Sequence, residues 1–263
     1  MAQPELPAHH SQKVEDLRVL VRARRRGIYI YALPNLLTSA NLLLGFLAIL
    51  LAVDGRYIQA VWAVLFSSIF DMLDGRVARL TNTTSRFGVE YDSLCDLVSF
   101  GIAPSILIYF AALKPFGRAG MVAAFVFALC GALRLARFNV LADVVPKSYF
   151  MGLPIPIASL TLCTSLLFAE ELRIDAYRNP WFLALTLSLG MLMVSTFKFP
   201  SFKDTHVRRR RAFSPFAFLF ITLVILVSWF EVAAFSFFLI YIILSVSLHG
   251  VRSWQQWKKA KNA

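Results

Sequence analysis

The stretch "FDMLDGRVARLTNTTSRFGVEYDSLCDLVSFG", Phe70–Gly101, contains four aspartates in an otherwise apolar part of the chain. Asp71 and Asp74 are three residues apart, so they share one face of a helix. Gly75 and Ala78 each follow one of these aspartates by four residues and lie on the same face. The face therefore carries two carboxylates beside small residues, which would let a flat ligand approach the backbone.

A second acidic stripe follows after a short connection. A helix that begins near Ser85 brings Gly88, Asp92 and Asp96 onto one face, because they are spaced four residues apart. Two helices joined by so short a link must be antiparallel neighbours. We therefore expect both acidic faces to converge at the same membrane depth, close to one surface.

The composition predicts a polytopic α-helical membrane protein. The chain has 263 residues, of which 58% are hydrophobic, whereas a soluble domain has about 45–50%, and its mean hydropathy is +0.65. A spanning helix needs roughly 20 apolar residues. Eight such segments are predicted, at about 33–53, 56–79, 87–113, 118–139, 153–171, 180–199, 213–230 and 232–250.

Three regions are expected along the chain. Residues 1–32 form a cytoplasmic segment, in which 10–31 reads as an amphipathic helix on an anionic membrane surface or, alternatively, as a plain basic tail. Residues 33–200 form the core. Residues 201–263 hold a basic loop with the run 208–211, two further transmembrane helices and a basic tail.

The positive charge indicates the orientation. With the N-terminus in the cytoplasm, the cytoplasmic segments hold 22 Lys and Arg and the outer segments hold 5, out of 27. Cytoplasmic loops are enriched in these residues, so both termini and the acidic site are predicted to be cytoplasmic. This bias also accounts for most of the net charge of +12 without a nucleic-acid partner. The three cysteines, Cys95, Cys130 and Cys163, lie in apolar runs and are expected to be buried and unbridged.

Four carboxylates at this depth favour a metal site. A charged side chain inside a membrane is costly, and four anions also repel one another, so a cation would relieve both penalties. Ligands that are all oxygen suit Mg²⁺, Mn²⁺ or Ca²⁺ and not Zn²⁺. The alternative is structural pairing with arginines at the helix ends: Arg76, Arg79 and Arg86.

The aspartates also form a motif. The pattern D-x-x-D-G-x-x-A-R, eight residues, then G-x-x-x-D-x-x-x-D is matched at every fixed position from Asp71 to Asp96. It resembles the signature of the CDP-alcohol phosphatidyltransferases. "RLARFN" (Arg134–Asn139) and "GLPIPIA" (Gly152–Ala158) resemble the phosphatidylserine synthase branch, and "LPNLLTSAN" (Leu33–Asn41) resembles the family's entry to its first span.

The resemblance implies a fold, a reaction and a set of ligands. The fold is a six-helix core, here with two extra helices. The reaction is metal-dependent transfer of a phosphatidyl group from CDP-diacylglycerol to L-serine, which gives phosphatidylserine and CMP. Asp71, Asp74 and Asp92 would bind Mg²⁺ or Mn²⁺, with Ca²⁺ possible, and Asp96 would contribute to the metal and act as the general base. A homodimer is also expected.

Further residues are candidates for binding the substrates. Gly75, Ala78 and Gly88 would leave room for the cytidine beside Asp74, and Arg79 would contact phosphate or hold an aspartate. Asn35 and Thr38 would contact the nucleotide or cap the first span. Arg134 and Arg137 would bind the serine carboxylate or a phosphate, because arginine binds such groups bidentately; the alternative is that they serve only topology.

Three other readings stay open. A sister enzyme would use the same metal site with glycerol 3-phosphate or inositol, and only the region Arg134–Ala158 argues for serine. A cation transporter would line a path with intramembrane aspartates, but its acidic site would lie nearer mid-membrane. A membrane scaffold would use structural Asp–Arg pairs.

Overall fold

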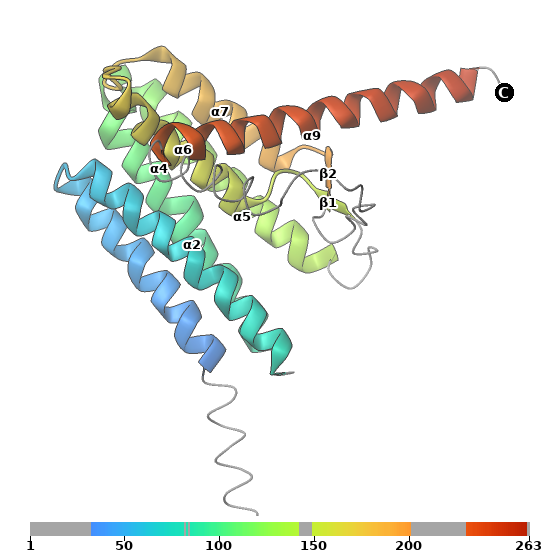
Figure 1. Cartoon of the computed structure of the whole chain (residues 1–263), viewed down its shortest axis with the longest axis horizontal. Coiled ribbons are helices and arrows are strands. Elements are labelled where there is room, and N and C mark those ends of the chain that lie inside the picture. Colours follow the sequence, from blue (N-terminus) through green and yellow to red (C-terminus); the bar gives the residue numbers. More distant parts are fainter. Residues whose placement is uncertain (1–32, 82, 84, 142–148, 201–229, 262–263) are drawn as a thin grey trace, which may run out of the picture.

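The structure is a computed structural model that describes residues 33–81, 83, 85–141, 149–200 and 230–261. These residues form a bundle of helices and one small pair of strands (Figure 1). The α-helices are Leu33–Val53, α2 Tyr57–Leu80, α3 Arg86–Asp96, α4 Ala103–Ile108, α5 Arg118–Leu141, α6 Ile155–Glu171, α7 Pro180–Val194 and α9 Phe230–Lys261. The other elements are the π-helices η1 Leu97–Ile102 and η2 Tyr109–Leu113, the 3₁₀-helix η3 Lys114–Phe116, and strands β1 Tyr149–Met151 and β2 Lys198–Pro200.

Within the described residues, 4 helices are long and apolar enough to cross a membrane: Leu33–Val53, Tyr57–Leu80, Arg86–Phe116 and Arg118–Val140. Two shorter apolar helices are Pro180–Val194 and Glu231–Ser247. The expected membrane helical bundle is confirmed, and the protein is an integral membrane protein. Residues 213–229 of the predicted span 213–230 lie outside the described residues, as does the predicted surface helix 10–31.

The link between α2 and α3 is short and is held by local hydrogen bonds. The Thr81 hydroxyl donates to the Val77 carbonyl over 2.7 Å, and the Thr83 amide donates to the Ala78 carbonyl over 3.0 Å. Ser85 then caps α3, because its hydroxyl accepts from the Gly88 amide at 3.0 Å. The two helices therefore turn back on each other as the sequence predicts, with the start of α3 close to residue 85.

The third span changes its winding directly after the acidic stripe. Helix α3 ends at Asp96 and passes without a break into η1, a π-helical segment. There the first span approaches closely, because a Cβ atom at Gly45 would collide with the backbone and hydroxyl of Ser99. The first and third spans are thus locked together one turn beyond Asp96.

A compact junction joins the start of α6 to the end of α7. Strands β1 and β2 pair antiparallel, with Phe150 opposite Phe199. Gly152 follows β1 with a φ of 78°, and a side chain there would meet the Met193 carbonyl. The Gly152 amide donates to the Phe197 carbonyl over 2.9 Å.

This junction corrects one predicted span. The segment at about 180–199 was predicted as helix throughout, but α7 ends at Val194 and Lys198–Pro200 is strand β2. Apolar composition alone does not distinguish a helix from a short strand, and the pairing with β1 comes from a segment about 50 residues away in sequence.

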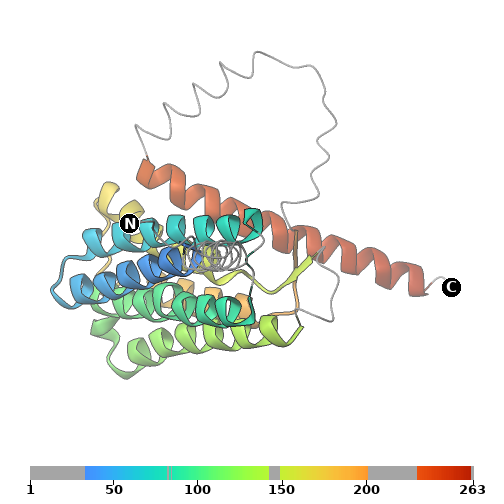
Figure 2. The ribbon, with the colours of Figure 1, turned by 90° about the horizontal axis from the view of Figure 1, so that it is seen from below.

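Helix α9 packs on α6 and extends well beyond the bundle, toward the C-terminus in Figures 1 and 2. Its ring contacts include Phe235 with Phe168, at 5.0 Å between centroids, and with Trp181, at 5.8 Å. The predicted span 232–250 corresponds to the apolar helix Glu231–Ser247, and the helix itself has 32 residues and continues to Lys261. The polar residues of this tail are good helix formers, so the helix does not stop where the apolar run stops.

The buried core consists of small and apolar side chains from the spans, among them Phe100, Phe127 and Phe182, which are almost fully buried. The three cysteines are buried and free, as predicted. Large apolar side chains also cover the outside of the bundle, for example Leu36, Phe46 and Phe125, as expected where lipid is the solvent.

Candidate functional site

The structure brings the two acidic stripes together. Each of Asp71 and Asp74, from α2, and Asp92, from α3, has a carboxylate oxygen within 4.8 Å of the corresponding oxygens of the other two. The carboxyl groups of Asp71 and Asp96 lie close enough to interact with each other. All four predicted aspartates therefore belong to one cluster, at the end of the bundle where α2 stops and α3 starts.

The first span supplies neutral partners to two of these acids. The Thr38 Oγ1 lies 2.7 Å from Asp74 Oδ2 and 3.0 Å from the Pro34 carbonyl. The Asn41 side-chain amide donates to Asp96 Oδ1 over 3.3 Å. The acidic cluster is therefore bordered by three helices: the first span, α2 and α3.

These contacts revise the reading of the first span. Neither Asn35 nor Thr38 is an N-cap, since Leu33 and Pro34 are already helical. Thr38 is buried, with 4% of its surface exposed, and faces Asp74. Asn41 is absent from the sequence-based set of site residues, although an asparagine at the end of "LPNLLTSAN" inside an apolar helix is a signal that could have identified it.

The cluster fits a hard divalent cation. Among the residues that the structure describes, Asp92 Oδ1 is buried and has no hydrogen-bond partner, which is costly for a polar atom unless something else binds it. The contact between two acids, Asp71 and Asp96, also needs a proton or a cation between them. The donors are all carboxylate oxygens, the set that suits Mg²⁺, Mn²⁺ or Ca²⁺.

The structural alternative for the aspartates is not supported. In the described part of the chain, none of the four carboxylates forms an ion pair with Arg76, Arg79 or Arg86. Arg79 is exposed at the end of α2. The acidic cluster is therefore not neutralised by the arginines closest to it in sequence.

The small residues beside the cluster differ in the space around them. A Cβ atom at Gly75 would meet nothing nearer than Arg79 Nη2, at 3.9 Å. A Cβ atom at Gly88 would lie 3.2 Å from Ser85 Oγ and 3.7 Å from Asn35 Oδ1, so this position is crowded. Ala78, on the same face as Asp74, is half-buried. Asn35 and Gly88 are thus neighbours across two spans.

The two arginines of "RLARFN", both on α5, have different surroundings. The Arg134 side chain is 8% exposed, and its buried Nε atom has no hydrogen-bond partner among the described residues. Its guanidinium lies over the Phe138 ring, 5.9 Å from the centroid. The charge of Asp96 acts on this guanidinium, so Arg134 is a buried cation within electrostatic reach of the acidic cluster.

Arg137 instead holds the end of α7. Its Nη1 donates to the Val194 carbonyl over 3.0 Å, and its Nη2 lies 3.2 Å from the Ser195 carbonyl and 3.4 Å from that of Met193. These are C-terminal carbonyls of a helix, which lack partners within the helix. The sequence predicts one role for both arginines, whereas the structure gives Arg137 a structural one.

One further contact of "RLARFN" was not predicted. Asn139 donates to Glu90 Oε2 over 3.1 Å and to Ser93 Oγ over 3.0 Å. It thereby ties the end of α5 to α3 on either side of Asp92. Glu90 itself is exposed and lies two positions from Asp92, off the acidic stripe.

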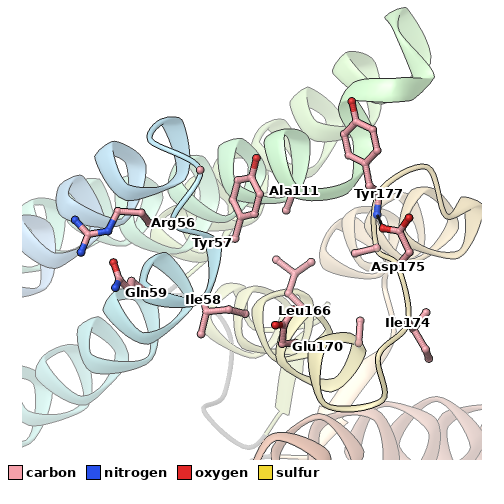
Figure 3. A pocket seen from close by; sticks show the side chains of 13 residues that line it. Arg56, Tyr57, Ile58, Gln59, Ala111, Leu166, Glu170, Ile174, Asp175 and Tyr177 are labelled. Carbon is pink, nitrogen blue, oxygen red and sulfur yellow. Dashed lines mark hydrogen bonds between the residues drawn. The ribbon is translucent and has the colours of Figure 1, made fainter.

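A separate cavity of about 490 Å³ lies at the other end of the bundle (Figure 3). Its lining includes Tyr57, at the start of α2, and Glu170, at the end of α6. Tyr57 precedes Asp74 by 17 residues of one helix, which is roughly 25 Å along the axis. This cavity is therefore not part of the acidic site.

The chain resembles known proteins over most of its spans. Residues 31–189 match the family described as CDP-alcohol phosphatidyltransferase. A CDP-diacylglycerol–serine O-phosphatidyltransferase of Helicobacter pylori (strain ATCC 700392 / 26695) is 42% identical over 175 residues, which cover 66% of this chain and 74% of the relative. A protein of the same name from Bacillus subtilis (strain 168) is 37% identical over 172 residues, 65% of this chain and 91% of the relative.

An archaeal relative is also similar. It is an archaetidylserine synthase of Methanothermobacter thermautotrophicus, 39% identical over 171 residues, which cover 64% of this chain and 70% of the relative. The family match spans more than half of the chain and includes all four aspartates of the cluster. The chain therefore belongs to the CDP-alcohol phosphatidyltransferase family and is an enzyme that transfers phosphate-containing groups.

Proposed function

We propose that the protein is a CDP-diacylglycerol–serine O-phosphatidyltransferase. The observation that carries the proposal is the cluster of Asp71, Asp74 and Asp92, whose oxygens lie within 4.8 Å of one another on the family's motif. Relatives at 37–42% identity carry the name of this activity, which supports serine as the acceptor alcohol.

Asp71, Asp74 and Asp92 would hold a divalent cation, Mg²⁺ or Mn²⁺, with Asp96 contributing. Such an ion supplies charge neutralisation between four carboxylates and an anionic pyrophosphate, which would otherwise repel each other. Thr38 holds Asp74 in place through its hydroxyl. Gly75 and Ala78 would leave space for the cytidine, while Gly88, without a side chain, would let Asn35 lie close enough to contact it.

The reaction needs positioning more than covalent help. The serine hydroxyl attacks the phosphorus nearest the lipid, a new P–O bond forms, and the bond to CMP breaks. Asp96 takes the hydroxyl proton as general base. Its site is buried, with 9% of the residue exposed, so water competes poorly with serine for the phosphorus.

Arg134 is the residue that would bind the serine carboxylate. Within the described residues its buried Nε has no hydrogen-bond partner, and the charge of Asp96 acts on its guanidinium, so a carboxylate bound there would satisfy the arginine and bring the serine hydroxyl toward the base. Arg137 serves this site indirectly, by holding the end of α7. Arg79, exposed at the end of α2, is available for phosphate.

The proposal extends to the regions of the chain, its orientation in the membrane and its oligomeric state. Residues 33–200 form the catalytic core, preceded by the surface segment 1–32 and followed by 201–263, with eight spans in all. Both termini and the active site face the cytoplasm, because 22 of the 27 Lys and Arg residues then lie on that side. The protein acts as a homodimer.

The proposal is tested by release of CMP from CDP-diacylglycerol by purified protein with a panel of alcohols. Serine should be the preferred acceptor, ahead of glycerol 3-phosphate and inositol. Excess chelator should abolish release, and added Mg²⁺ or Mn²⁺ should restore it. Preference for another alcohol would reassign the substrate, and full activity in chelator would refute the metal site.

A further inference from the structure

A buried chain of hydrogen bonds connects three spans to the proposed base. The Ser67 hydroxyl of α2 donates to the Asn41 side-chain carbonyl of the first span, and the Asn41 amide donates to Asp96 Oδ1 of α3 over 3.3 Å. Asn41 and Ser67 are 0% exposed. No water reaches these groups, so each side chain depends on the others for its hydrogen bonds.

The donor and acceptor at each step of this hydrogen-bond network follow from the chemistry of the side chains. An amide has a donor end and an acceptor end, whereas a carboxylate can only accept. Asn41 must therefore turn its NH₂ toward Asp96 and its oxygen toward Ser67, whose hydroxyl supplies the matching donor. Ser67 thus fixes the orientation of the amide that meets the carboxylate.

The backbone of the first span is also held against the third span at this point. The Ser99 hydroxyl donates to the Asn41 backbone carbonyl over 3.0 Å. Ser99 also faces Gly45 so closely that no side chain fits between the two spans. These contacts fix the first span against the third, so Asn41 and Asp96 stay opposite each other.

We propose that Asn41 is a positioning residue that fixes the plane of the Asp96 carboxylate, with Ser67 setting the orientation of the Asn41 amide. The inference rests on the base role given to Asp96 above. Asn41 is suited to this role because a neutral donor holds one oxygen of Asp96 without bringing in a positive charge that would compete with a divalent cation.

The test is a double-mutant cycle between Asn41→Leu and Asp96→Asn. Asn41→Leu keeps the number and branching of the side-chain heavy atoms and removes the donor. It should lower kcat about 10–100-fold, the usual effect of losing an orienting partner, and leave the KM for serine near the wild-type value. In the Asp96→Asn background the same substitution should cause little further loss. Ser67→Ala should act in the same direction with a smaller effect.

A matched control separates positioning from general damage. Thr164 is 0% exposed on α6, and in the part of the chain that the structure describes its hydroxyl donates to carbonyls of its own helix. Thr164→Val should leave kcat unchanged. If Asn41→Leu lowers kcat by the same factor in both backgrounds, Asn41 acts independently of Asp96 and the proposal is wrong.

Mn²⁺ affinity, measured by electron paramagnetic resonance on the full-length protein, gives a readout that does not need turnover. Asn41→Leu should weaken Mn²⁺ binding in the wild-type background and not in the Asp96→Asn background. If the wild type released no CMP with any alcohol, the proposed function would fail while this cycle would still decide the role of Asn41. Coupling between the two substitutions supports positioning, and equal effects in both backgrounds, or no effect in either, overturn it.

Discussion

The Thr38 hydroxyl on the first span lies 2.7 Å from Asp74 Oδ2 on α2, so a residue outside the aspartate motif holds one of its carboxylates. Thr38→Val keeps the shape and removes this donor. A hydrogen bond to a charged group is worth about 1.5–3 kcal/mol, so metal affinity should fall roughly 10–100-fold. The measurement is the Mn²⁺ concentration dependence of CMP release.

Thr186→Val is the matched control for Thr38→Val. Thr186 is 0% exposed, lies on α7, and donates to the Phe182 carbonyl of its own helix over 2.7 Å. It should leave the Mn²⁺ dependence unchanged. Equal Mn²⁺ dependence of Thr38→Val and wild type would show that Asp74 does not need Thr38.

Asp96→Asn and Asp71→Asn should fail in different ways. Asp96→Asn keeps the shape and removes the base, so CDP-diacylglycerol should still bind with metal while turnover falls about 10²–10⁴-fold. Asp71→Asn removes a ligand of the three-aspartate cluster and should weaken metal-dependent nucleotide binding itself. A binding assay with both variants distinguishes them, and equal loss of binding would make Asp96 primarily a metal ligand.

Arg134→Lys and Arg137→Lys should have different effects, one on the KM for serine and the other on stability. Lysine keeps the charge and loses the bidentate fork, so Arg134→Lys should raise the KM for serine about tenfold, which corresponds to about 1.4 kcal/mol, with little change in thermal stability. Arg137→Lys should lower the melting temperature, because Arg137 donates to carbonyls at the end of α7 and each such bond contributes about 1 kcal/mol.

Steady-state kinetics with varied serine and thermal unfolding in detergent check both variants. An unchanged KM in Arg134→Lys would remove this arginine from the serine site. A selective rise in KM for Arg137→Lys at wild-type stability would instead return Arg137 to the substrate.

The orientation can be tested by labelling single cysteines with a reagent that does not cross membranes. A cysteine in place of Lys203 should react only from the cytoplasmic side, and one in place of Asp175 only from the outside. Cys95, Cys130 and Cys163 are buried and should give a low background. The reverse pattern would overturn the orientation and place the active site on the outer face.

The sequence by itself determined the acidic stripes and the membrane bundle. Helix geometry fixes which residues share a face, so the spacing of Asp71, Asp74, Asp92 and Asp96 was enough to predict one cluster. The short link capped by Ser85 was enough to predict antiparallel neighbours. These features are local, and local geometry can be read from residue spacing.

Only the tertiary structure decided which residues serve that cluster. Thr38 and Asn41 face the aspartates because the first span packs against α2 and α3 in one register, held where Gly45 meets Ser99. Arg134 and Arg137 look alike in sequence, yet only Arg137 meets the end of α7. Contacts between helices depend on packing across the bundle, and residue spacing within one helix carries no information about them.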